Sequence, residues 1–237
     1  MQELIASIRH NAVGLSLFAL VTAGAISVTQ VVTADRIEHN IRMAQARALN
    51  EIVPAQSYDN DLLNDSLDID ARFNQQLLGP LPDDAVIYRA RENGVTHTVI
   101  LPAVAPDGYT MEIGLLVGIK ADGSVAGVRV TSHRETPGLG DKIDLKKSRW
   151  VLDFEGKSLS QPDSDLWAVK KDGGEFDQFT GATITPRAVV KAVKHALKFF
   201  ELHRNLLLED TMNNASNDKQ NNAQQPDPMT DQIQAGG

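Results

Sequence analysis

The chain of 237 residues contains no cysteine. It therefore forms no disulfide, holds no thiolate-bound zinc or iron–sulfur cluster by itself, and has no cysteine nucleophile. Basic residues are also in deficit, with 23 Lys and Arg against 31 Asp and Glu and a net charge of -8. Because nucleic-acid binding needs a basic surface to meet the phosphates, we expect no nucleic-acid partner. Any redox chemistry must come from a bound cofactor.

Common catalytic and nucleotide-binding signatures are missing as well. The sequence has no G-x-S-x-G, no H-E-x-x-H and no P-loop. Gly138-Leu139-Gly140 begins like a dinucleotide fingerprint, but Ile143 stands at the third glycine position, so a Rossmann interpretation fails. The six histidines show no metal-ligand spacing, and we predict no metal site.

The N-terminal region holds a long uncharged run. Residues 11–34 carry no charged side chain over 24 residues, and roughly 20 suffice to cross a bilayer as a helix. A cleaved signal peptide is the alternative, because Ala23-Gly24-Ala25 is a small-x-small pattern. Apolar residues continue beyond that site to Val32, so we predict an uncleaved transmembrane anchor. Positive charges flank both sides of the run, and the positive-inside rule leaves its orientation open.

Composition divides the chain into four segments. A helix is predicted to leave the membrane and to end near Ile52, because Pro54 stops it. An acidic stretch of loop and short helix follows. Ten of residues 211–237 are Asn or Gln, which predicts a disordered tail. The predicted segments are an N-terminal segment 1–34 that contains the transmembrane helix, a juxtamembrane helix and loop 35–84, a ligand-binding domain 85–208 and a disordered polar tail 209–237.

Turn residues predict two β-hairpins in the third segment. The first covers residues 85–102 with Asn93-Gly94 at its turn, and the second covers residues 109–133 with Asp122-Gly123. We also predict short strands at Trp150–Phe154 and around Leu166–Val169. The fold class is therefore α+β, with antiparallel hairpins and flanking helices.

A strongly amphipathic helix is predicted from Pro186 to about Leu208. Thr185 suits its N-cap and Pro186 its first position. The loop Asp177–Pro186 precedes it and reads DQFTGATITP. Small residues let a backbone lie close to a ligand, and a helix N-terminus attracts phosphate. A plain capped helix after a tight turn explains the same residues.

A second loop, Ser132–Asp141, leaves a strand end and reads SHRETPGLGD. Its Pro-Gly and Leu-Gly pairs make a stiff loop with several polar side chains, which is typical of a pocket wall. A structural corner is the alternative interpretation.

Together these two segments resemble the FMN-binding domain family. Asp177 with Thr180-Gly181-Ala182-Thr183 is similar to the D-x-x-[ST]-G-A-T flavinylation motif, and Glu135-Thr136-Pro137-Gly138-Leu139-Gly140 is similar to its companion motif. The family includes the G subunit of the Rnf (or Rsx) electron transport complex and the C subunit of the sodium-translocating NADH:quinone reductase. The run TGATITPRAVVKAVKHAL is more similar to the Rnf member. The resemblance covers roughly residues 1–208.

The resemblance implies FMN joined through its phosphate to Thr183 by a separate flavin transferase. Thr180, Gly181, Ala182 and Thr185 then shape the phosphate end, and Glu135 to Gly140 line the flavin. It also implies a single-pass protein of the bacterial inner membrane, with its domain on the periplasmic side among other proteins of the complex. The expected function is electron relay coupled to ion translocation, with no catalytic side chain and no self-sufficient enzyme activity. One alternative is the C subunit of the sodium-translocating NADH:quinone reductase, which uses the same kind of site in another complex. A cofactor-free membrane-anchored scaffold or binding domain is the alternative from a different class.

Overall fold

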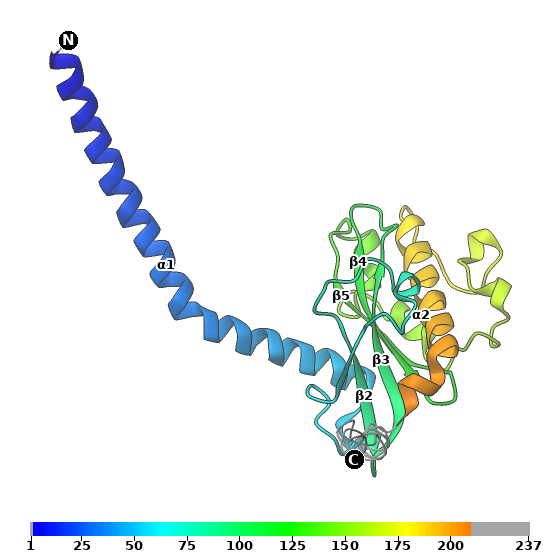
Figure 1. The fold of residues 1–237 in the computed structure, drawn as a ribbon. Coiled ribbons are helices and arrows are strands. Elements are labelled where there is room, and N and C mark those ends of the chain that lie inside the picture. The colour runs from blue at the N-terminus through cyan, green and yellow to red at the C-terminus, as the bar shows by residue number, and fades with distance from the viewer. Residues whose placement is uncertain (1, 210–237) are drawn as a thin grey trace, which may run out of the picture. The chain divides into compact units, whose positions relative to one another are not determined.

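The computed structural model describes residues 2–209 (Figure 1). The predicted polar tail lies outside the described residues from residue 210 onward. The chain divides into two compact units, one up to Arg47 and one from Ala48. The first helix, α1 (Gln2–Ile52), runs through the first unit and ends in the second. It ends two residues before Pro54, as predicted.

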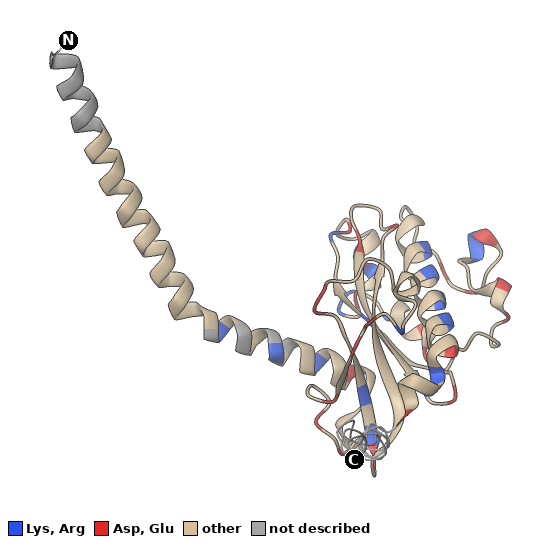
Figure 2. Cartoon of the chain, viewed as in Figure 1, with Lys and Arg blue, Asp and Glu red and all other residues tan. Residues whose placement is uncertain are grey.

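The first unit contains the expected membrane-spanning stretch. Residues Ala12–Ala34 form 23 residues of α1 that are long and apolar enough to cross a membrane. No charged residue falls within this stretch (Figure 2). The Thr29 hydroxyl donates a hydrogen bond to the Ala25 carbonyl at 2.8 Å, and the Thr33 hydroxyl donates to that of Thr29 at 2.7 Å. These polar side chains are thus satisfied within the helix, which suits an apolar surrounding.

The second unit is built on a five-stranded antiparallel sheet. Its strands lie in the order β1-β2-β3-β4-β5, so the predicted α+β class is confirmed. Asn93 and Gly94 have φ angles of 53° and 81° and close the first hairpin as predicted. The strands are β1 (Ser66–Asp68), β2 (Val86–Glu92), β3 (Val95–Ala105), β4 (Ile113–Lys120) and β5 (Val125–Ser132).

Both faces of this sheet are covered. The long helix α2 (Ile184–Leu208) packs its apolar side, including Val189 and Val193, on one face (Figure 1). On the other face Ile52, at the end of α1, packs in a smaller apolar cluster. A Cβ added to Gly118 of β4 would lie 2.2 Å from the Ile52 Cγ2 atom. The glycine therefore lets the helix end approach the sheet.

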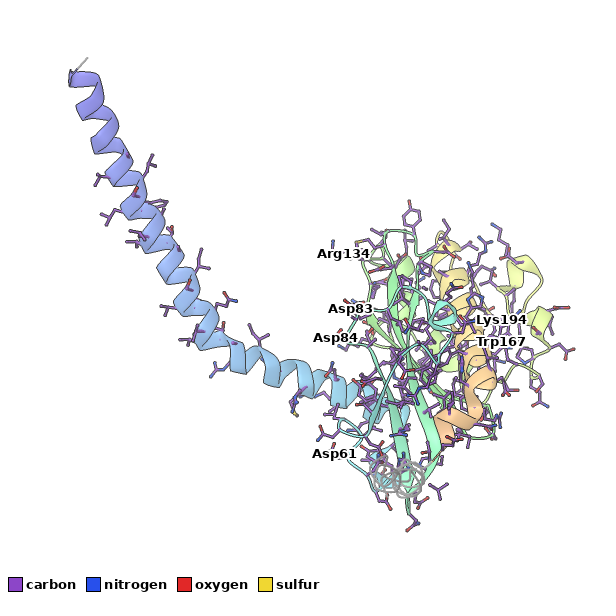
Figure 3. The ribbon with its side chains drawn as sticks, viewed as in Figure 1. Asp61, Asp83, Asp84, Arg134, Trp167 and Lys194 are labelled. Carbon is purple, nitrogen blue, oxygen red and sulfur yellow. The ribbon has the colours of Figure 1, made fainter. Side chains whose placement is uncertain are left out.

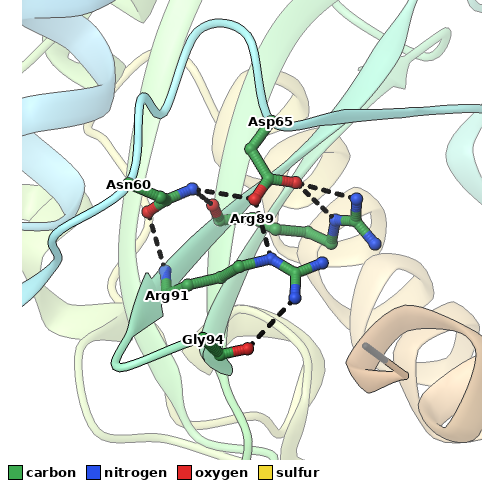
Figure 4. A network of polar contacts seen from close by, with 5 residues as sticks. All are labelled: Asn60, Asp65, Arg89, Arg91 and Gly94. Atoms are coloured by element: carbon green, nitrogen blue, oxygen red, sulfur yellow. Dashed lines mark hydrogen bonds and ion pairs between the residues drawn. The ribbon is translucent and has the colours of Figure 1, made fainter. Parts of the chain in front are cut away.

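The acidic stretch before the sheet contributes more than the predicted loop and short helix. It holds the 3-10 helices η1 (Ala55–Ser57) and η2 (Gln75–Leu78), and also the edge strand β1. Asp65 lies beside this edge and binds two arginines of β2, with its carboxylate 2.7 Å from Arg89 Nη2 and 2.7 Å from Arg91 Nε (Figure 4). This cluster, the Asp65 cluster, fastens the stretch to the sheet.

The two additional predicted strands are wrong. Residues Trp150–Phe154 form a 3-10 helix, η4, because the buried residues Trp150, Val151 and Phe154 follow a helical rather than an alternating spacing. Near Leu166 the chain forms another 3-10 helix, η5 (Ser164–Leu166), and Val169 makes a single bridge to Phe176. Between residues 150 and 180 the chain is held by an aromatic cluster, whose ring centroids lie 4.6 to 6.2 Å apart. Its members are Trp150, Phe154, Trp167 (labelled in Figure 3), Phe176 and Phe179.

Candidate functional site

The loop 177–183 turns sharply just before α2. Phe179 and Ala182 form an antiparallel bridge, with the Ala182 N–H donating to the Phe179 carbonyl at 3.1 Å. Gly181 has a φ of 81°, a conformation that residues with a Cβ rarely adopt. The sharp turn brings the small residues of the loop to the N-terminus of α2, where unpaired backbone N–H groups favour an anion.

The helix begins two residues earlier than predicted, and the predicted Thr185 N-cap is wrong. Thr183 occupies the cap position, and its side chain makes no capping hydrogen bond. Thr185 is fully buried in the first turn, where its hydroxyl donates a short hydrogen bond to Glu135 Oε2. The Thr183 hydroxyl is therefore not used as a cap, and its side chain is partly exposed.

The second loop folds between β5 and the 3-10 helix η3 (Gly140–Ile143). The N–H groups of Leu139 and Gly140 both donate to the Thr136 carbonyl at 3.1 Å. The Gly138 N–H donates to Asp141 Oδ1 at 2.7 Å. The loop is thus a tight turn closed by its own backbone, as its Pro-Gly and Leu-Gly pairs predict.

Neighbouring residues of this loop point in opposite directions. Arg134 is exposed at the edge of the domain (Figure 3), whereas only 4% of Glu135 is exposed. The Glu135 Oε1 atom accepts a hydrogen bond from the Thr110 N–H at 3.1 Å. A Cβ added to Gly140 would lie 2.8 Å from both Glu135 Oε2 and Thr185 Oγ1. This glycine lets the loop pack directly on the Glu135–Thr185 pair.

The two loops line one open pocket of about 330 Å³. This volume falls within the range of small-molecule and cofactor sites. Predicted residues Asp177, Thr180, Pro137 and Gly138 do not line it, although all four lie in the same two loops. The lining residues are Tyr109, Glu135, Thr136, Leu139, Gly140, Gly181, Ala182, Thr183, Ile184 and Thr185.

Sequence reasoning missed two of the lining residues. Tyr109 is 66% exposed in the loop between β3 and β4, and Ile184 is 44% exposed at the first position of α2. Both side chains add exposed apolar surface to the pocket lining. Their exposure and their position at the pocket depend on the tertiary structure, so no pattern in the sequence identified them as site residues.

Asp177 supports the site through its backbone. The Trp150 indole N–H donates to the Asp177 carbonyl at 2.8 Å, and the Trp150 ring packs edge-on against Phe179. The Asp177 carboxylate points to solvent and lies 2.6 Å from Lys170 Nζ. Hydrogen bonding to this carboxylate raises the pKa of the Lys170 amine. Through Trp150, the aromatic cluster thereby holds the beginning of the loop 177–183 in place.

A second surface pair fastens the start of α2. Arg187 donates two hydrogen bonds to the Asp172 carboxylate, at 2.6 and 2.8 Å. These bonds lower the pKa of the Asp172 carboxyl and raise that of the Arg187 guanidinium. Among the side chains that the structure describes, no group of three or more acidic or histidine residues could hold a metal ion.

Fold and site together define a class of protein, an α+β domain with a cofactor-sized pocket that follows a helix of membrane-spanning length in the chain. The FMN-binding domain family model matches residues 108–198, which contain both loops. A second family model, the RnfG N-terminal region, matches residues 1–52.

Full-length relatives narrow this class. A Pseudomonas aeruginosa protein is 52% identical over 202 residues, which cover 85% of this chain and 92% of the relative. A Pseudoalteromonas atlantica protein is 46% identical over 204 residues, covering 86% and 92%. A Vibrio vulnificus protein is 44% identical over 208 residues, covering 87% and 96%. Each is described as the G subunit of an ion-translocating oxidoreductase complex. The chain belongs to this G-subunit family, which confirms the resemblance to the Rnf member.

Proposed function

We propose that this chain is a membrane-anchored flavoprotein subunit that relays electrons through FMN joined covalently to Thr183. It works within a complex that couples electron transfer to ion translocation across the cytoplasmic membrane. One observation carries the proposal: the two motif loops meet in one pocket, and a threonine hydroxyl that is not used as a cap lies in its wall. The G-subunit family supplies the setting.

The residues of the pocket fit FMN at both of its ends. The N-terminus of α2 suits the phosphate, and its dipole stabilises a phosphodiester charge by about 0.3–1 kcal/mol at an exposed position. Gly181 and Ala182 leave room for close backbone approach beside it. Tyr109, Leu139 and Ile184 offer exposed apolar surface for the flavin ring system.

Attachment is a phosphoryl transfer catalysed by a separate flavin transferase with FAD as donor. A bond forms between Thr183 Oγ1 and the phosphorus atom on the FMN side of FAD. The diphosphate bond of FAD breaks, AMP leaves, and the hydroxyl loses its proton. The transferase supplies the catalytic groups for this step. The contribution of this chain is therefore the position of the Thr183 hydroxyl and not a change in its acidity.

When bound, FMN supplies the one- and two-electron redox chemistry that a chain without cysteine lacks. The chain holds and orients the cofactor, and none of its side chains is assigned an acid–base step. It acts as a redox component of the complex rather than as a self-sufficient enzyme. Its partners are the other proteins of the complex and the flavin transferase.

We place the chain in the bacterial inner membrane as a single-pass protein with its domain on the periplasmic side. Residues Ala12–Ala34 provide the span. A covalent link suits a periplasmic position, because it prevents loss of a cofactor outside the cellular flavin pool. N-terminal sequencing of membrane-extracted protein tests the anchor. A mature chain that begins at Ile26 would contradict it.

Intact mass of the chain from its native host tests the cofactor. We expect every mature molecule to carry one increment equal to FMN less one water molecule. Copurification with the other proteins of the complex is expected in mild detergent. An unmodified mass in flavin-replete cells would contradict the covalent link, and purification without partners would contradict the assignment to a complex.

A further inference from the structure

Glu135 lines the pocket and joins three segments of the chain. It is the one charged side chain among the lining residues, and it is buried. Its Oε1 atom accepts from the Thr110 N–H, in the loop between β3 and β4. Its Oε2 atom accepts from the Thr185 hydroxyl, in the first turn of α2. The Glu135 carboxylate thus connects the loop Ser132–Asp141 both to the loop between β3 and β4 and to the first turn of α2.

We propose that Glu135 is a positioning residue for flavin attachment. It fixes the first turn of α2, so that Thr183 is held toward the incoming phosphorus atom. It also engages the Thr185 hydroxyl and leaves Thr183 as the hydroxyl available for esterification. The inference rests on the proposed function, because it concerns the same attachment step.

The contact between Glu135 and Thr185 has the form of a nucleophile and its base. Burial excludes this role, since none of Thr185 is exposed and the phosphorus atom arrives on a separate enzyme. Thr183 lies two residues away on the same turn and is partly exposed. Displacement of Thr185 therefore moves Thr183, and misplacement of a reacting group by about 1 Å can cost about 100-fold in rate.

The test follows covalent flavin per chain over time, in full-length protein co-expressed with a flavin transferase. Fluorescence after denaturing electrophoresis measures the covalent fraction. Glu135→Ala loses both contacts, and we expect the loading rate to fall about tenfold or more. Glu135→Gln keeps the geometry, because its amide oxygen accepts from Thr110 and its amide nitrogen donates to Thr185. We expect this variant to load close to the wild-type rate.

Asp65→Ala is the matched control. Asp65 is also a carboxylate that holds two segments together, but it lies in the Asp65 cluster and not in the pocket (Figure 4). Its loss is expected to lower stability and to leave the loading rate of folded chains unchanged. Equal slowing in Asp65→Ala and Glu135→Ala would overturn the inference, since loading would then follow stability alone.

Thr185→Val keeps the inference testable if Glu135→Ala fails to accumulate. It replaces the hydroxyl by a methyl group of similar size, so loading is expected to slow, whereas Thr185→Ser keeps the hydroxyl and is expected to load normally. Wild-type loading in folded Glu135→Ala or in Thr185→Val contradicts the positioning role. Flavin mapped to Thr185 in the wild-type chain contradicts the selection of Thr183.

Amide hydrogen exchange separates this inference from the proposed function. If wild-type protein carries no covalent flavin, the covalent link fails. The positioning role is then decided on the unloaded chain. Faster exchange of the amides at residues 187–189, which close the first turn of α2, in Glu135→Ala, with wild-type exchange in Glu135→Gln, supports it. Unchanged exchange in Glu135→Ala overturns it.

Discussion

Two threonines at the start of α2 lie in different environments, although they are only two residues apart. Thr183 stands at the cap position with a partly exposed side chain, whereas Thr185 is fully buried against Glu135. The sequence places both beside a helix start and does not distinguish their hydroxyls. The distinction comes from a contact with a residue 50 positions earlier in the chain.

We predict that Thr183→Ala abolishes covalent flavin, because alanine has no oxygen to join the phosphate. Thr183→Ser should retain most of it. Thr180→Ala is the matched control within the loop and should lower loading less, since Thr180 does not line the pocket. In-gel flavin fluorescence after denaturation measures the outcome. A fluorescent Thr183→Ala band together with a dark Thr180→Ala band would contradict the assignment to Thr183 and indicate that Thr180 carries the flavin.

Thr185→Val is expected to destabilise the domain by about 1–3 kcal/mol. The substitution leaves the buried Glu135 Oε2 atom without its donor, and an unsatisfied buried acceptor carries a desolvation cost of that size. Thermal unfolding of the full chain in detergent measures the effect. Thr185→Ser restores the hydroxyl and should unfold near the wild-type temperature. An unchanged unfolding temperature in Thr185→Val would mean that the hydrogen bond between Thr185 and Glu135 contributes little to stability.

At the scale of elements, periodicity and turn residues predicted the helices and both hairpins. The apolar side of α2 repeats at helical spacing, and Asn93-Gly94 matches the turn that it forms. The sequence prediction failed at η4 and η5, because 3-10 helices of five and three residues are too short for their spacing to be distinguished from a strand in the sequence. It also could not place Tyr109 at the pocket, because the loop between β3 and β4 reaches it only through the folded sheet.

The contact between the end of α1 and β4 gives a prediction about packing. Gly118→Ala should destabilise the domain by about 1–3 kcal/mol, because its Cβ would lie 2.2 Å from Ile52 Cγ2. That methyl group belongs to a β-branched side chain with little rotamer freedom. Gly127→Ala is the control, since its Cβ would meet Ile52 only at an ordinary 3.5 Å. Equal unfolding temperatures for the two variants would contradict this account.

At the scale of the whole molecule, span and site belong to different compact units. The span lies before Arg47, and both motif loops lie after Ala48. The charged residues follow the same division: residues 11–34 carry none, whereas the chain as a whole has a net charge of -8. The structure leaves the predicted boundaries at residues 34 and 84 as predictions.

Residues 211–237 are predicted to be dispensable for flavin loading. Their sequence is too polar to bury much surface, with Met212, Met229 and Ile233 as its only large apolar residues. A stop codon after Asp210 should leave flavin per chain unchanged. Loss of most covalent flavin in the truncated chain, at normal abundance, would show that this segment takes part in loading.

The aromatic cluster also makes cofactor attachment visible by optical spectroscopy. The chain has two tryptophans, and both belong to this cluster. Trp150 is hydrogen-bonded to the loop that carries Thr183. Flavins absorb where indoles emit, so flavin at Thr183 should quench the intrinsic emission of the domain. Maturation could then be followed continuously in solution, and Trp150→Phe should remove much of the change.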